Sequence, residues 1–168
     1  MNISDIQLLF DYNYWANQLM LTTAAHLTPE QFAQPTAFPW GSLQDTLIHV
    51  MDTEYSWREV CQNGLIAPEL TESEPFDTLE SIASYWKKEE QNMWSYINSL
   101  QDEDMDSIIR YEVSAGMRER VLWHCLVHVV NHGTQHRSEC AQMLTEFGHS
   151  PGDIDFTMYV MMRAAGDV

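Results

Sequence analysis

The stretch HCLVHVVNHGTQHRSE, residues 124–139, places a histidine at every fourth position: 124, 128, 132 and 136. On an α-helix, four residues advance the chain by about 400° and about 6 Å, so these imidazoles form a slanted stripe about 18 Å long. One metal ion, which binds imidazole nitrogens at about 2.0–2.1 Å, cannot reach all four. Two adjacent histidines at this spacing can share one ion, and the other two must then serve another purpose.

The two halves of this histidine ladder have different neighbours. His124 and His128 lie in the apolar run VLWHCLVHVV, which is typical of a buried helix face. His132 and His136 lie in NHGTQHR, among small and polar residues. Gly133 costs about 1 kcal/mol in a helix interior relative to alanine, which favours a close approach of another backbone or a ligand there. We therefore expect His132 and His136 to be the metal-binding pair.

A third ligand must come from another helix, because two imidazoles hold an ion weakly. His26 and His149 fall near predicted helix ends, whereas His49 lies in the middle of SLQDTLIHVMDTEYSW, at the border of an apolar stripe. A side chain at such a border projects into the core of a helical bundle. Three neutral imidazoles with one open position are typical of a catalytic metal site rather than a closed structural one.

The alternative is that the histidines only support packing. A single helical histidine is more often a hydrogen-bonded packing residue than a ligand. Four in succession are harder to explain in this way, because each buried imidazole needs polar partners for both nitrogens. A bundle with merely structural histidines stays open as an interpretation at this point.

The rest of the sequence predicts an all-α fold with a single domain over residues 1–168. Ser42 with Asp45, and Asp77 with Glu80, are typical of helix starts. Ile108 to Val113 predict a short β-hairpin whose turn contains Gly116. Helical periodicity covers about 5–27, 42–61, 78–100, 119–147 and, as a short last helix, 156–165. The expected fold is a four-helix bundle with long connections, a hairpin-like element and a short C-terminal helix.

Composition excludes several classes of function. With 8 Lys and Arg against 25 Asp and Glu, the formal net charge is −17, which disfavours binding to nucleic acid and to anionic membranes. No stretch predicts a signal peptide or a membrane span, so a cytoplasmic location is expected. The three cysteines form no C-x-x-C pair and are expected to be reduced and buried.

Four segments resemble the DinB/YfiT-like family of metal-dependent enzymes, which also includes thiol-dependent S-transferases and relatives of maleylpyruvate isomerase. They are LFDYNYWAN (9–17), SLQDTLIHVMDTEYSW (42–57), LVHVVNHGTQHRSECAQML (126–144) and GHSPGDIDFTMYV (148–160). They are spread from residue 9 to residue 160, so the resemblance extends over nearly the whole length of the chain, and their combination is specific although each alone is weak.

The resemblance implies a four-helix bundle with one divalent metal ion held by His49, His132 and His136. His128 matches the histidine that precedes the NHxxxH pair in many members and is not expected to bind the ion. Asn131 belongs to the same motif, and His124 has no role that can be carried over. Members of the family are often homodimers, so a homodimer is a further expectation.

An ion with an open position lowers the pKa of a bound water or thiol and polarises a carbonyl group. By resemblance, the expected reaction is attack of a low-molecular-weight thiol on a small electrophilic substrate. Imidazole ligands favour zinc or nickel. The rival hypothesis is a non-catalytic metal-binding stress-response protein that uses the same three histidines.

Several further residues are candidates for a role near the ion. Tyr12, Trp15 and Asn17 lie on a helix expected to face the site and could shape its pocket, although core packing is the commoner role of such a tryptophan. Arg137 could pair with an anionic substrate or form a salt bridge with solvent-exposed acids. Asp52, like Glu54, could accept a hydrogen bond from a ligand imidazole.

Overall fold

The computed structural model describes residues 1–72 and 75–168. In chain order the elements are α1 (Ile3–Ala24), α2 (Pro29–Phe32), α3 (Leu43–Asn63), η1 (Leu70–Glu72), α4 (Leu79–Ile97), η2 (Asp102–Asp104), β1 (Ile108–Val113), β2 (Gly116–Val121), α5 (Leu122–Glu146) and α6 (Phe156–Ala165). The predicted four-helix bundle, its β-hairpin and its short last helix are confirmed. No helix among the described residues is long and apolar enough to cross a membrane.

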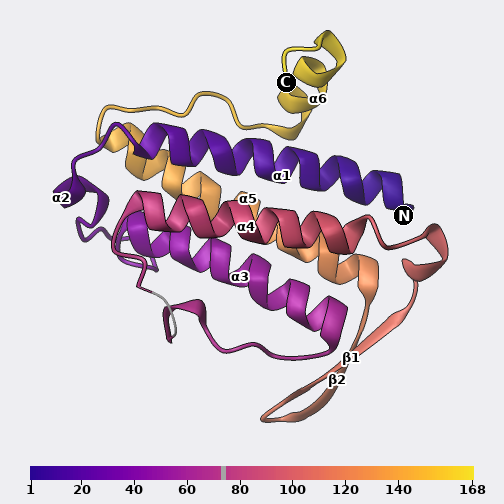
Figure 1. The fold of residues 1–168 in the computed structure, drawn as a ribbon. Helices are drawn as coiled ribbons and strands as arrows, with labels where there is room; N and C mark the ends of the chain where they lie inside the picture. Colours follow the sequence, from indigo (N-terminus) through magenta and orange to yellow (C-terminus); the bar gives the residue numbers. More distant parts are fainter. Residues whose placement is uncertain (73–74) are drawn as a thin grey trace.

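The four long helices form two pairs of opposite direction (Figure 1). Helices α1 and α5 run one way, and α3 and α4 run the other. Each of α1 and α3 packs against both α4 and α5. The chain therefore crosses the bundle diagonally from α1 to α3 and again from α4 to α5. These two crossings explain why the connections are long, and they bring α3 beside α5.

The helix that carries His49 has well-defined ends. The Ser42 side chain accepts a hydrogen bond from the backbone N–H of Asp45 at 3.0 Å, as predicted for a helix start. Gly64 ends the helix in the left-handed region at φ 66°, where glycine has no steric penalty. The position of His49 along α3 is thus fixed by a cap on each side.

Two predicted helix starts are wrong. Thr78, not Asp77, caps α4, because Thr78 and Ser81 exchange side-chain and backbone hydrogen bonds. The fourth long helix begins at Leu122 rather than near residue 119, because the preceding residues pair with β1: Arg110 faces Glu119 and Ile108 faces Val121 in an antiparallel register.

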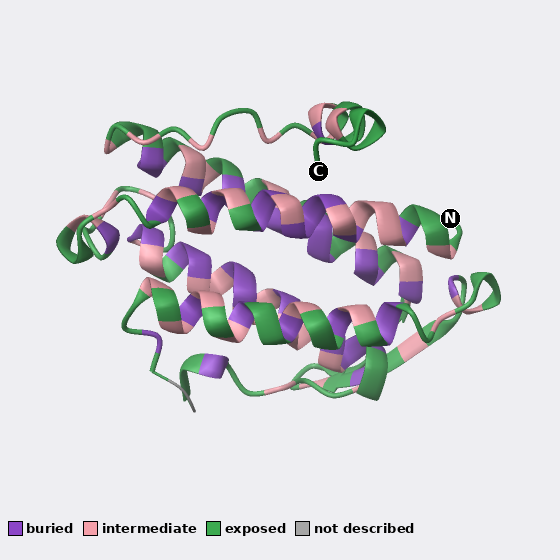
Figure 2. Cartoon of the chain, turned by 45° about the horizontal axis from the view of Figure 1, so that its top comes forward, coloured by how far each residue is buried: buried purple, intermediate pink, exposed green. Residues whose placement is uncertain are grey.

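The core of the bundle is mostly apolar, and Figure 2 shows the buried residues on the helix faces that point inward. Large side chains such as Phe10, Met51 and Leu126 are fully buried. Charged side chains also lie inside the bundle, because Glu54 and Arg137 are 1% and 0% exposed. Charges this deep need hydrogen-bond partners, and those partners lie next to the candidate site.

Candidate metal centre

Three of the seven histidines meet where α3 packs against α5. His49 comes from the middle of α3, and His132 and His136 come from successive turns of α5. The Nε2 atoms of His49 and His132 are 3.0 Å apart, and one ring nitrogen from each of the three histidines lies within 4.8 Å of the other two. Among the described residues, this is the group whose atoms could hold a metal ion.

The spacing and orientation of these nitrogens fit a tetrahedral ion. Two nitrogens bound at about 2.05 Å in tetrahedral geometry lie about 3.3 Å apart, close to the observed Nε2–Nε2 separation. His136 directs Nδ1 at the Glu139 carboxylate, with Nδ1 and Oε2 2.8 Å apart, which leaves Nε2 for the ion. A carboxylate on the far nitrogen is the usual support of a metal-binding imidazole.

Burial keeps two of the three imidazoles neutral. Burial, and after it the charge of a protonated His136, lower the pKa of His49 to about 4 and that of His132 to about 3. The Nδ1 atom of His132 is buried without a hydrogen-bond partner. Neutral imidazole is the form that binds a metal ion, so His49 and His132 need release no proton near pH 7.

Two residues of the site were not predicted from the sequence. Glu139 lies three residues after His136, a spacing that places both on one helix face and could have identified it. Trp40 lies in the loop before α3, and its ring is stacked on His49 with centroids 3.6 Å apart and planes 17° apart. Trp40 is 44% exposed, and its stacked ring covers one face of the His49 imidazole. No periodic pattern marks a loop residue of this kind.

The sequence model of the DinB family matches residues 1–167. The chain belongs to the DinB family. It is similar to protein DinB of Bacillus subtilis (strain 168), with 27% identity over 165 residues and 92% of each chain covered. The uncharacterized protein YizA of the same organism is 22% identical over 127 residues, which cover 73% of this chain and 78% of YizA.

Two solved structures share the fold. A DinB-like protein from Bacillus cereus ATCC 10987 superposes with a TM-score of 0.73 at 18% identity, covering 90% of this chain and 97% of that one. YfiT from Bacillus subtilis superposes with a TM-score of 0.60 at 14% identity, covering 86% of both chains. YfiT is described as a probable metal-dependent hydrolase with an unusual four-helix-bundle topology.

The other half of the histidine ladder is exposed rather than buried as expected. His124 and His128 are both exposed, although His128 still lies against Trp57 of α3. The His128 ring lies 5.8 Å from that of His132 and 5.0 Å from that of Trp57. His128 therefore adjoins the three-histidine site of this DinB-family chain, whereas His124 packs on Trp123.

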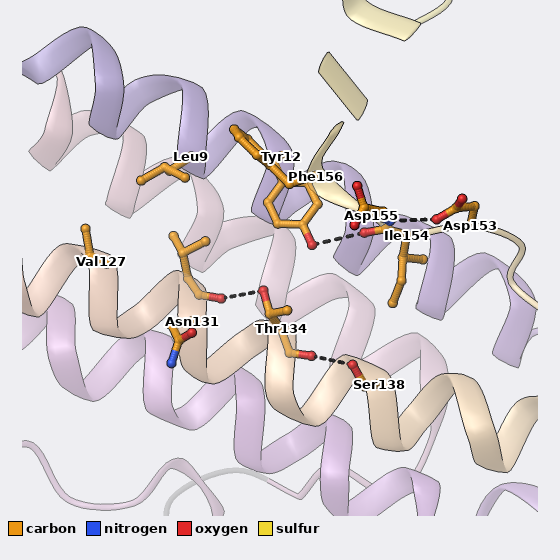
Figure 3. Close-up of a pocket in the computed structure, with 11 residues that line it drawn as sticks. Leu9, Tyr12, Val127, Asn131, Thr134, Ser138, Asp153, Ile154, Asp155 and Phe156 are labelled. Atoms are coloured by element: carbon orange, nitrogen blue, oxygen red, sulfur yellow. Dashed lines mark hydrogen bonds between the residues drawn. The ribbon is translucent and has the colours of Figure 1, made fainter. Parts of the chain in front are cut away.

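Three predicted neighbours lie elsewhere. Tyr12 and Asn131 line a pocket of about 500 Å³ that contains none of the three histidines. Figure 3 shows the wall that α5 contributes to it and the hydrogen bond from the Tyr12 hydroxyl to the carbonyl of Ile154, which is 3.0 Å long. Trp15 packs on Tyr12 and, with ring centroids 5.3 Å apart, on Tyr159. Trp15 thus packs against other aromatic rings, which is the commoner role of such a tryptophan, and does not shape the pocket of the three histidines.

Arg137 has neither of its predicted roles. It is fully buried, and its Nη1 donates to the side-chain oxygens of Asn13 and Asn17 at 2.6 and 2.7 Å. The amide nitrogens of the same two asparagines donate to Glu54 Oε1 at 2.8 and 2.9 Å. Trp86 completes the cluster by donating to Glu54 Oε2 at 2.8 Å. This network was not predicted from the sequence, because its members come from four different helices and share no local spacing.

Gly133 and Asp52 support the site from a distance. A Cβ atom on Gly133 would lie 2.5 Å from Arg137 Nη1 and 2.9 Å from Asn13 Oδ1, so the expected close approach is to side chains rather than to a backbone or a ligand. Asp52 accepts a hydrogen bond from the backbone N–H of Leu70 at 2.7 Å and so holds the loop after α3. Within the described part of the chain, the hydrogen bonds found for Asp52 and Glu54 go to Leu70, Asn13, Asn17 and Trp86 and not to a candidate ligand.

Proposed function

We propose that this protein is a divalent-metal-dependent enzyme in which His49, His132 and His136 bind one ion, most naturally zinc or nickel. The observation that carries the proposal is the convergence of three imidazole nitrogens within 4.8 Å, with His136 held on its far side by Glu139. The description of YfiT as a probable metal-dependent hydrolase supports the same kind of site in this fold. Zinc and nickel both accept imidazole ligands readily.

Three protein ligands leave an open position, at which a bound ion would make a coordinated thiol or water more acidic. The chain supplies the geometry: Glu139 orients His136, and Trp40 covers one face of His49. The nucleophile must come from outside, since Cys61, Cys125 and Cys140 are all buried and none belongs to the three-histidine cluster. We propose a low-molecular-weight thiol as that nucleophile and a small electrophile as its target.

Elemental analysis of purified protein tests the metal site. We expect one ion per chain in the wild type, loss of the ion in His132→Ala, and full occupancy in His124→Ala. His124→Ala is a matched control because it removes an imidazole from the same helix outside the cluster. Equal metal loss in both variants, or no stoichiometric metal in the wild type, would refute the site.

Turnover assays of metal-loaded protein test the reaction. Consumption of glutathione, bacillithiol or mycothiol in the presence of a panel of electrophiles, absent in His132→Ala, is the result expected for a thiol transferase. Metal-dependent ester or amide hydrolysis without any thiol would assign water as the nucleophile instead. Stoichiometric metal without turnover in either assay would favour the non-catalytic metal-binding protein.

A further inference from the structure

Cys61 of α3 and Cys125 of α5 lie opposite each other at the hairpin end of the bundle. The rings of Trp57 and His128 join the two helices there, with centroids 5.0 Å apart. Because α3 and α5 run in opposite directions (Figure 1), the next turn of α3 lies beside the preceding turn of α5. Cys61 follows Trp57 by four residues and Cys125 precedes His128 by three, which are the spacings that keep side chains on one helix face. The two cysteines are therefore the next pair across this interface.

The packing around the two cysteines agrees with this register. Cys61 and Cys125 are 8% and 2% exposed and belong to one apolar cluster with Tyr96, whose hydroxyl donates to the backbone carbonyl of Cys61 at 3.0 Å. A hydrogen bond joins the two thiols. This bond, with a smaller contribution from the charge of Arg120, lowers the pKa of Cys125 in spite of its burial. The same bond, together with burial, raises the pKa of Cys61. Cys125 is thus the member of the pair that forms a thiolate more readily.

Cys125 is also part of the wall of a cavity of about 380 Å³, which we call the hairpin-end cavity. Its lining residues are Trp57, Tyr111, Arg120, His124, Cys125 and His128. The side chains of Arg120, His124 and His128 are exposed, so the cavity opens to solvent. Cys61 is not part of this wall. A small reagent that enters the cavity therefore meets Cys125 first.

The third cysteine of the chain has a different environment. Cys140 is fully buried in a separate apolar cluster, to which neither Cys61 nor Cys125 belongs. Burial raises the pKa of its thiol. Since the thiolate is the reactive form of cysteine, Cys140 serves as an internal reference for an unreactive thiol in the same fold.

We propose that Cys61 and Cys125 are a redox-active pair, which hydrogen peroxide entering the hairpin-end cavity converts to a disulfide. First, the Cys125 thiolate attacks one peroxide oxygen and the O–O bond breaks. The departing hydroxide takes up the proton that the thiol released, which leaves a sulfenic acid at Cys125. Second, the Cys61 sulfur attacks the Cys125 sulfur, the S–O bond breaks, and the hydroxide leaves as water with the proton of the Cys61 thiol. Two thiols thus lose two electrons, and one peroxide is reduced to two waters.

The disulfide joins the two helices that carry the three histidines, without using any of the three. Cys61 lies 12 residues after His49 on α3, and Cys125 lies seven residues before His132 on α5. The bond is therefore about two to three helical turns from the cluster. Its formation requires no metal ion, so the inference goes beyond the proposed function and does not depend on it.

Peptide mapping of metal-free protein tests the pair. The protein is treated with hydrogen peroxide, remaining thiols are blocked with a maleimide in denaturant, and tryptic peptides are analysed by mass spectrometry. Trypsin cleaves after lysine and arginine, so the three cysteines fall on the separate peptides 59–87, 121–137 and 138–163. We expect the first two peptides to become linked, with a mass lower by two hydrogen atoms, and dithiothreitol to restore both thiols. Cys140 should be oxidised about tenfold more slowly or less.

Serine variants assign the two roles. In Cys125→Ser, Cys61 should stay reduced, whereas in Cys61→Ser oxidation should stop at a sulfenic acid on Cys125 that dimedone traps. Cys140→Ser is the matched control, because it removes a buried cysteine from the same helix as Cys125, and its disulfide should form at the wild-type rate. Circular dichroism verifies that each variant folds, and the wild-type peptide map decides the question if one does not.

The inference is overturned if peptides 59–87 and 121–137 are not linked in the peroxide-treated wild type. It is equally overturned if Cys140 is oxidised as fast as Cys125, because the peroxide would then act without regard to the cavity. A link between two chains, seen as a dimer on a non-reducing gel, would also refute the pairing of Cys61 with Cys125 within one bundle.

Discussion

Replacing Arg137 by methionine tests whether the buried polar network holds the bundle together. The substitution keeps the length and apolar stem of the side chain but removes the guanidinium. Nη1 would no longer donate to the side-chain oxygens of Asn13 and Asn17, and Nη2 would no longer donate to the Thr134 hydroxyl at 3.1 Å. The carboxylate of Glu54, 1% exposed, would remain without a nearby positive charge.

The expected cost follows from these losses. Removing one member of a buried charge pair typically destabilises a protein by about 3–5 kcal/mol. Leaving a buried acceptor without a donor costs about 1–3 kcal/mol, and two asparagine oxygens are affected here. Since the asparagines can turn and the guanidinium is itself costly to bury, the terms do not simply add. We expect Arg137→Met to lower the free energy of unfolding by about 3–5 kcal/mol.

Urea unfolding of metal-free protein, followed by circular dichroism, measures this change. With an m-value of about 2 kcal/mol/M, the midpoint should fall by about 1.5–2.5 M. Arg110→Met is the matched control, because Arg110 is 62% exposed on its side chain and pairs with the equally exposed Glu119. Its loss should cost at most about 1 kcal/mol.

The double variant Glu54→Gln, Arg137→Met keeps the test decisive even if Arg137→Met alone does not fold. Removing both charges leaves no unpaired carboxylate inside the bundle, so the double variant should be more stable than Arg137→Met by at least about 1 kcal/mol. A loss below about 1 kcal/mol in Arg137→Met, or strictly additive effects in the double variant, would refute the view that the two charges stabilise each other through the asparagines.

Three further predictions concern the candidate metal centre. Gly133→Ala should reduce the free energy of unfolding by about 1–3 kcal/mol, measured as a lower melting temperature. The added methyl group would lie 2.5 Å from a guanidinium nitrogen of Arg137, and this clash outweighs the better helix propensity of alanine. Glu139→Ala should weaken zinc affinity about 10- to 100-fold in calorimetric titrations, since His136 loses its orienting carboxylate, and unchanged affinity would contradict that role. In metal-free protein, the pKa values of His49 and His132 are lowered to about 4 and about 3. The unfolded chain therefore binds more protons at these two histidines than the folded chain does once the pH falls below about 6.5. Stability should therefore fall by about 1–2 kcal/mol between pH 7 and 5 in urea titrations, and a variant with alanine at both positions should lose most of that slope.

Local patterns in the sequence predict much of the site. The pair His132 and His136 follows from helical spacing and from the polar residues around it, and His49 follows from its place at the border of an apolar stripe. These inferences need only the geometry of one helix at a time. The same is true of the cap at Ser42 and of the helix end at Gly64, both of which the structure confirms.

The interpretation of Arg137 is wrong for a physical reason. In a sequence, an arginine in an acidic protein predicts a solvent-facing salt bridge, because burying an unpaired charge is costly. Its burial depends on two asparagines from α1 and a glutamate from α3, and their proximity is a property of the assembled bundle. The exposure of His124 and His128 has a similar origin, because it depends on which segments the assembled fold places beside α5 and not on the composition of that helix.

Helix α1 contributes no histidine to the cluster, yet it links the two helices that do. Asn13 and Asn17 are four residues apart and each uses both ends of its amide, donating to Glu54 on α3 and accepting from Arg137 on α5. Glu54 lies about one and a half turns after His49, and Arg137 directly follows His136. A sliding movement of α3 against α5 would break the hydrogen bonds of Asn13 and Asn17 before it displaced the imidazoles by a full turn. The paired asparagines of LFDYNYWAN therefore set the register in which the three histidines meet.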